Sequence, residues 1–150
     1  MTDETQEDVQ EFGIHSIYLK DVSFESPNAP AIFMEQVQPQ IQMDLNITSN
    51  PLAEDVFEVV LSVTITAKAE DKTAFLVELQ QAGAFSLKGF DDDTIGPMLG
   101  IYCPNLLFPY AREAISNLVT KGGFPQLLLE PVNFEALYAQ HMQEQTSTVQ

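Results

Sequence analysis

The sequence predicts an α+β fold, in which a four-stranded antiparallel sheet packs against a long helix and a second helix follows at the C-terminus. Three observations carry this prediction. Residues 37–48 alternate apolar and polar side chains with the period of two that a half-exposed strand requires. Residues 57–68 and 73–87 continue the pattern on either side of a short polar turn, and short turns join antiparallel strands. After residue 90 the apolar spacing becomes helical, and strands followed by helices are typical of α+β domains.

The first strand is expected at residues 12–24, and a loop that contains Pro27 and Pro30 follows it. In the second strand Pro39 lacks an amide proton for the ladder, so we expect this strand at a sheet edge or a bulge at Pro39. The third and fourth strands each have one apolar face, and the residues of these faces are Phe57, Val59, Leu61, Val63 and Ile65, then Phe75, Val77 and Leu79.

The long helix is expected at residues 105–121, ended by the glycine pair 122–123. Its apolar residues form two adjacent stripes, which is more surface than one sheet face needs. Either the sheet wraps around this helix or another subunit covers it. The last helix begins after Asn133, a favourable N-cap, with Val132 and Leu137 at the positions of a hydrophobic staple.

These elements form one expected domain over residues 12–144. Residues 1–11 are acidic and are expected to be a disordered tail. Residues 145–150 are polar and are expected to fray.

The charge of the chain limits its partners. It has 22 acidic and 6 basic side chains, for a formal net charge of -16. Nucleic acid and anionic membranes need clustered Lys and Arg, so the sequence argues against both. A basic protein partner is favoured, because a field of one sign steers association with the opposite sign. Keeping an apolar protein soluble would account for the charge equally well.

The sequence indicates a cytoplasmic protein. Cys103 is the only cysteine, so no intramolecular disulfide can form, which fits a reducing compartment. The N-terminus is acidic where a signal peptide would be basic and then apolar. No apolar run approaches the roughly 20 residues that cross a bilayer, so we expect no direct membrane insertion.

Catalytic chemistry is not indicated. His15 and His141 are far apart and lie in no motif, and Cys103 has no basic neighbour. Residues 91–93 lack the ligand alternation and closing Glu of a calcium loop, and residues 96–100 do not match a phosphate-binding loop. We therefore expect no enzyme activity, no cofactor and no metal.

Three long strings resemble the SecB family of protein-export chaperones. Residues 17–30 (IYLKDVSFESPNAP) resemble its first strand and crossover loop, and residues 100–113 (GIYCPNLLFPYARE) resemble the entry to its long helix. Residues 123–134, with GFPQL and PVNF, resemble its interhelical loop. With the hairpin strands, the similarity covers residues 12–143.

The resemblance implies a homotetramer, a dimer of dimers, that binds unfolded precursor proteins without ATP and delivers them to the export ATPase SecA. It implies that a basic zinc-binding domain of SecA docks on the acidic sheet face, at Asp21, Glu25, Leu76 and Glu78. It places the family's assembly positions at Val77, Leu79 and Gln81. Strand parity agrees, because Asp21 and Glu25 can share one face, as can Leu76 and Glu78.

A client groove is expected between the crossover loop and the last helix. Met and aromatic side chains suit promiscuous binding, and a free strand edge can pair with an extended client. The candidates are Phe24, Phe33, Ile41, Met43, Tyr138 and Met142. These residues could equally belong to an ordinary core.

Other functions remain open at this point. A general holdase of the same fold without a SecA link would not need the paired acidic face. A metabolite-binding oligomer would use apolar grooves for small ligands. An enzyme would need convergent titratable groups, which the sequence does not offer.

Overall fold

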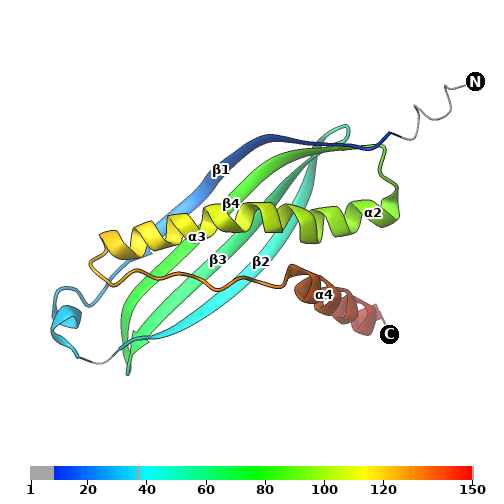
Figure 1. Cartoon of the computed structure of the whole chain (residues 1–150). Coiled ribbons are helices and arrows are strands. Elements are labelled where there is room, and N and C mark those ends of the chain that lie inside the picture. The colour runs from blue at the N-terminus through cyan, green and yellow to red at the C-terminus, as the bar shows by residue number, and fades with distance from the viewer. Residues whose placement is uncertain (1–8, 37, 150) are drawn as a thin grey trace, which may run out of the picture.

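The computed structural model describes residues 9–36 and 38–149, with the backbone alone at 146–149, and confirms the predicted α+β architecture (Figure 1). Four antiparallel strands form one sheet in the order β1-β4-β3-β2. Their bounds are β1 Glu11–Glu25, β2 Gln40–Ala53, β3 Val56–Ala69 and β4 Lys72–Lys88. Residues 1–8, most of the expected acidic tail, lie outside the described residues.

The chain crosses from one edge of the sheet to the other between β1 and β2, through the 3-10 turn η1, Ala31–Met34. This crossover loop is tied to the start of β4. Ser26 Oγ donates to the carbonyl of Ala74 at 2.9 Å, and Asn28 Nδ2 donates to the carbonyl of Thr73 at 2.9 Å. β2 is an edge strand, as Pro39 predicts, but Pro39 precedes the strand and causes no bulge within it.

β1 contains two irregularities in its pairing with β4, and the spacing of its apolar residues matches them. Its register skips His15 and Lys20. Each skipped residue shifts the alternation of side chains by one position. The apolar residues of β1 follow one another at intervals of two, three, two, three and two residues, and all of them therefore pair with inner-face residues of β4. These residues are Phe12, Ile14, Ile17, Leu19, Val22 and Phe24.

A nearly continuous helical rod lies across the inner face of the sheet (Figure 1). It consists of α2 Asp92–Pro97, a π-helical turn η2 at Met98–Tyr102, and α3 Cys103–Lys121. The predicted start at residue 105 is therefore wrong. Pro104 has no amide proton for a helical bond, and the wider π turn before it lets the helix continue. Asp91 caps the rod by accepting from the amide of Thr94 at 2.9 Å.

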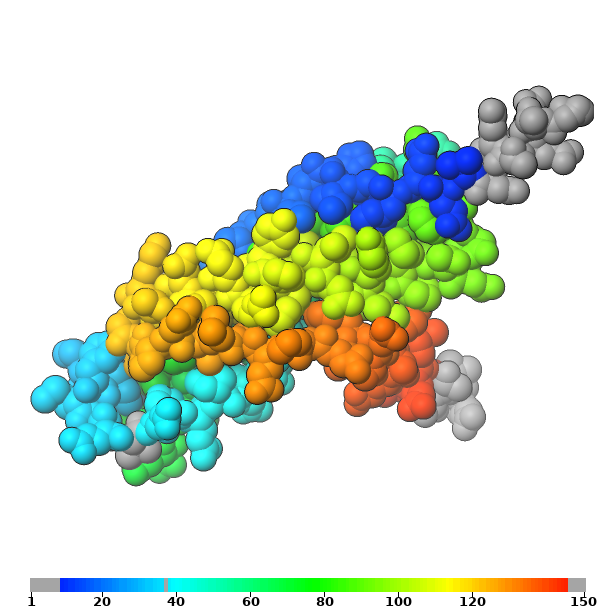
Figure 2. All heavy atoms as spheres, viewed as in Figure 1, coloured from blue at the N-terminus to red at the C-terminus, as the bar shows by residue number. Residues whose placement is uncertain are grey.

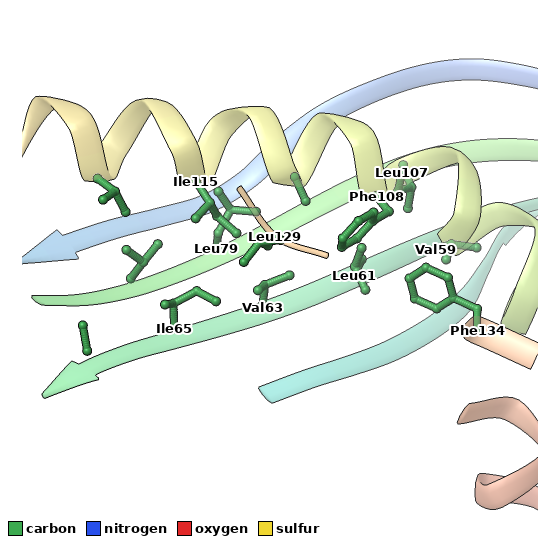
Figure 3. Close-up of a cluster of buried hydrophobic side chains, with 14 of the residues drawn as sticks. Val59, Leu61, Val63, Ile65, Leu79, Leu107, Phe108, Ile115, Leu129 and Phe134 are labelled. Atoms are coloured by element: carbon green, nitrogen blue, oxygen red, sulfur yellow. The ribbon is translucent and has the colours of Figure 1, made fainter. Parts of the chain in front are cut away.

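The core lies between this rod and the sheet. α3 buries Leu107, Ala111, Ile115 and Val119 completely. Figure 3 shows the side chains of α3 pointing onto β3 and β4. The facing sheet residues include Val59, Leu61, Val63, Ile65, Val77 and Leu79.

After α3 the chain turns at residues 122–123 and runs back in an extended segment, 124–133, beside the rod (Figure 1). Leu129 of this segment is buried in the core. Asn133 then caps α4, Phe134–Val149, by accepting from the amide of Ala136 at 3.0 Å, as predicted. The expected end at residue 144 differs from the structure. No Gly or Pro follows that position, so the helix continues to Val149.

Candidate functional site

The four residues expected to bind SecA come together on the outer face of the sheet. Glu25 pairs with Leu76, and Ser23 pairs with Glu78, so Glu78 lies one row along from that pair. Asp21 pairs with Gln80 in the next row. Since residues directly opposite in a ladder point to the same face, these side chains form one acidic patch around Leu76.

This patch is accessible and its carboxylates are not in ion pairs. Within the described part of the chain, the ion pairs join Lys20 to Glu58 and Lys72 to Glu35. Asp44 of β2 is a further member of this patch that was not predicted from the sequence. It shares a row with Thr64 of β3 and Glu78 of β4, and it is exposed. Asp44 lies on the polar side of the alternating strand, and this position was the signal in the sequence that could have placed it on the outer face.

The assembly residues are not on the surface of the chain. Val77 and Leu79 are 0% and 2% exposed and belong to the core under α3. Gln81 is 3% exposed, and its Nε2 donates to the carbonyl of Tyr18 at 3.0 Å. The rod of the same chain covers this face of β4, so Val77 and Leu79 pack in the chain's own core, and their expected role in assembly stays a prediction.

An aromatic cluster lies where the crossover loop meets the end of α3. The ring centroids of Phe33 and Phe124 are 5.2 Å apart, those of Phe75 and Phe124 are 4.9 Å apart, and Phe24 stacks on Phe75 at 5.9 Å. Gly122 lies against the ring of Phe24, so a Cβ at this position would force that ring to shift. Phe33 remains 45% exposed, so the cluster presents apolar surface to solvent.

A pocket of about 520 Å³ lies between β2, the start of the rod and α4. Tyr138 of α4 packs against Gly96 and Gly100, where a Cβ at residue 100 would lie 2.5 Å from the Tyr138 Cδ1. The sequence analysis considered these glycines only as part of a phosphate loop. Their spacing of four on a helix is the signal that a bulky side chain packs there. The walls are Leu45, Asn46, Ile47, Thr48, Ser49, Gly96, Leu99, Gly100, Leu137, Tyr138, Gln140, His141 and Glu144.

The six groove candidates therefore do not line one trough between the crossover loop and the last helix. α4 packs on η2, at the other end of the rod from the crossover loop (Figures 1 and 2). Met43 lies in the same row across the sheet as Phe24, because Met43 pairs with Ile65, Ile65 with Val77 and Val77 with Phe24. Ile41 lies in the next inner-face row, closer to the crossover loop. Tyr138 belongs to the pocket, and Met142 is exposed on α4 but outside the pocket walls.

A further surface, an exposed apolar stripe, was not predicted. Ile14, Leu19 and Val22 of β1 point to the inner side of the sheet, beyond the cover of the rod, and are 38–49% exposed. Tyr102 and Tyr110 are exposed on the rod, and Tyr102 packs edge-on against Phe12 of β1 with ring centroids 5.1 Å apart. The spacing of the apolar residues of β1, at intervals of two, three, two, three and two, was the signal in the sequence that could have predicted this stripe.

The residues that were considered for catalysis or metal binding lie in the following surroundings. Cys103 is completely buried, and burial raises the pKa of its thiol to about 12. His15 lies on the edge strand, whereas His141 lies in the pocket wall and contacts Gln145 at 3.1 Å. The described residues contain no cluster of three or more His, Cys, Asp or Glu side chains suited to a metal ion. Among the described helices, none is long and apolar enough to span a membrane.

The fold is that of the SecB-like chaperones. A SecB-like chaperone from Mycobacterium tuberculosis, solved with a peptide from an antitoxin, superposes with a TM-score of 0.68 at 16% identity, covering 81% of this chain and 90% of that one. The family model for preprotein translocase subunit SecB matches residues 5–145, so the chain belongs to the SecB family of protein-export chaperones.

Sequence relatives agree with this assignment. The chain is 56% identical over 148 residues to the protein-export protein SecB of Hydrogenovibrio crunogenus, covering 99% of this chain and 98% of that protein. It is 54% identical to the protein of the same name from Methylococcus capsulatus, covering 95% of this chain and 92% of that protein. SecB proteins are export chaperones rather than a family of enzymes.

Proposed function

We propose that this protein binds unfolded precursors along the inner side of its sheet and delivers them to SecA through the outer side, without using ATP. The observation that carries the proposal is the separation of two surfaces by one sheet. The acidic patch faces away from the rod, whereas the pocket and the aromatic cluster lie on the side of the rod. A client and a basic partner can therefore occupy the protein together.

The client path follows the inner face of β2. Ile41, Met43, Leu45 and Ile47 alternate along this strand, from the end with the aromatic cluster to the wall of the pocket. Residues 41–47 of the strand extend for about 20 Å, which suits an extended polypeptide better than a small ligand. β2 is also an edge strand, so its free backbone groups can pair with a client regardless of its sequence.

The SecA contact is supported by the charge of the outer face. Asp21, Glu25 and Glu78 are exposed around the half-buried Leu76. A basic domain that docks here would meet unpaired carboxylates and one apolar side chain. This combination favours both fast association and a defined docking orientation.

Assembly into a homotetramer is supported by the exposed apolar stripe on β1 and the rod. Monomeric proteins rarely expose contiguous apolar surface of this kind, and β1 is a free sheet edge. The buried thiol of Cys103 suits the reducing cytoplasm, where we place the protein.

Simultaneous binding tests the proposal. An unfolded precursor, diluted from urea into a solution of the protein, should form a complex that still binds SecA, as measured by light scattering coupled to size exclusion. A client complex that binds no SecA, with free protein that binds none either, would favour a general holdase. Displacement of the client by SecA at equilibrium would contradict separate surfaces.

A further inference from the structure

A buried carboxylate on the outer face links the two strands that flank β4. Glu58 of β3 is 7% exposed and accepts a hydrogen bond from Tyr18 Oη at 2.5 Å. Its two oxygens also accept from Lys20 Nζ, at 2.9 and 3.0 Å. β1 and β3 lie two strand spacings apart, about 10 Å, so these side chains meet above β4. They fit because β4 presents only Ala82 and Ala84 in the rows of Tyr18 and Glu58.

Lys20 is also the residue at which β1 bulges. The register with β4 passes from Leu19 to Asp21 and skips Lys20. Without this skip, Asp21 would pair with Leu79 and turn to the apolar inner face, and Val22 would turn outward. The bulge therefore decides on which side of the sheet each later residue of β1 lies.

The bulge is held from both faces of the sheet. On the inner side, Gln81 Nε2 donates to the main-chain carbonyl of Tyr18, two residues before the bulge at Lys20. On the outer side, Glu58 binds the side chains of Tyr18 and Lys20. Bonds to a charged group are roughly twice as strong as neutral ones, so we expect the outer contact to dominate.

We infer that Glu58 is a positioning residue, which fixes the bulge at Lys20 and so keeps Asp21 on the acidic patch and Val22 on the exposed apolar stripe. Glu58 also pairs with the ammonium group of Lys20, which is the only Lys or Arg of β1, so that this group does not neutralise the neighbouring Asp21. The consequence for binding rests on the proposed function, in which the patch contacts SecA.

Hydrogen exchange of the full chain tests this inference, with the variants Glu58→Gln and Tyr18→Phe and the control Glu54→Gln. Tyr18→Phe keeps the ring, which guards against loss of the fold, and Glu54 is an exposed acid near the same end of β3. Removing a bond to a charged group should raise the exchange of amides 16–23 by about tenfold and leave those of β3 unchanged. Affinity for SecA should fall about threefold or more, although Asp21 is unaltered.

The outcomes separate this inference from the proposed function. Unchanged exchange at residues 16–23 in both variants overturns the inference, whether or not SecA binds. Equal increases in all four strands would also overturn it, because Glu58 would then stabilise the fold without a specific role at the bulge. Local increases in a protein that never binds SecA would support the positioning role and contradict the proposed function.

Discussion

Glu25 of β1 lies directly opposite Leu76 of β4, with both side chains on the outer face of the sheet. Glu78 and Asp21 follow in the next two rows, so three carboxylates share one face of the sheet with the apolar residue. The same strands turn Val77, Leu79 and their neighbours into the core. Because a strand alternates its side chains, one sheet provides a charged surface on one side and an apolar one on the other.

Charge reversal at Glu78 should weaken SecA binding and leave the fold intact. We expect a loss of about tenfold at low salt, because Glu78→Lys removes one attraction and adds one repulsion. The matched control is Glu130→Lys, an equal charge change at an exposed acid on the extended segment beside the rod. Titration calorimetry at two salt concentrations measures both effects. Equal affinities for the two variants would contradict the role of the patch.

Leu79 and Tyr110 should respond in opposite ways to truncation. Leu79→Ala should lower the free energy of unfolding by about 2–5 kcal/mol, because Leu79 is buried in the chain's own core. Tyr110→Ala removes an exposed ring and should cost little stability but weaken assembly. Urea unfolding and sedimentation equilibrium of both variants make the comparison. A Leu79→Ala protein of wild-type stability that dissociates would instead support a direct interface role for Leu79.

Changing the shape of the pocket should reduce client binding. Gly100→Ala places a Cβ 2.5 Å from the Tyr138 Cδ1, so the ring must shift, and Tyr138→Ser removes that ring from the pocket wall. We expect both variants to lose about tenfold in affinity for an unfolded precursor, with a smaller loss for Met142→Ser on the exposed side. Leu128→Ser, another exposed apolar position, serves as the control. Wild-type client affinity in the first two variants would remove the pocket from the client path.

Stability should depend on pH through the pair Tyr18 and Glu58. The bond from Tyr18, and then the bond from Lys20, lowers the pKa of Glu58 below its ordinary value of 4.5. The contribution of Glu58 is therefore complete above that value and is lost as the pH falls through its lower, folded pKa. Burial, and then the bond to Glu58, raises the pKa of Tyr18 from 10.0 to about 12. Its contribution is complete below pH 10 and is lost as the pH rises toward 12.

Urea unfolding of the wild type and of Tyr18→Phe across the pH range measures this dependence. The difference in the free energy of unfolding should be largest near neutral pH and shrink at both extremes. A difference that is constant from acid to alkaline pH would show that the hydroxyl acts without the carboxylate.

Cys103 should be unreactive in the folded protein. Its thiol is completely buried and its pKa is raised to about 12, so very little thiolate is present at neutral pH. Modification by a thiol reagent should require unfolding, and reductant should leave the state of assembly unchanged. Rapid labelling of the native protein would contradict the burial.

Much of the fold was predictable because local patterns and packing agree. The alternation of β2, the apolar faces of β3 and β4 and the cap at Asn133 each predicted the observed element. The rod was predicted too short, because the helix was expected to begin at residue 105, whereas a π turn at Met98–Tyr102 lets it continue through Pro104. The acidic patch was predictable in part, since parity places residues on a face without showing which strands are neighbours.

The sequence by itself determined the elements, the charge of one strand face and the family. Only the tertiary structure decided that β1 lies beside β4, that Val77 and Leu79 are covered by the chain's own rod, and that α4 and the crossover loop lie at opposite ends. It also decided that Glu58 reaches Tyr18 and Lys20 across β4. Periodicity records the side of an element on which a residue lies, whereas the partner it meets depends on contacts between segments far apart in the chain, which no local pattern contains.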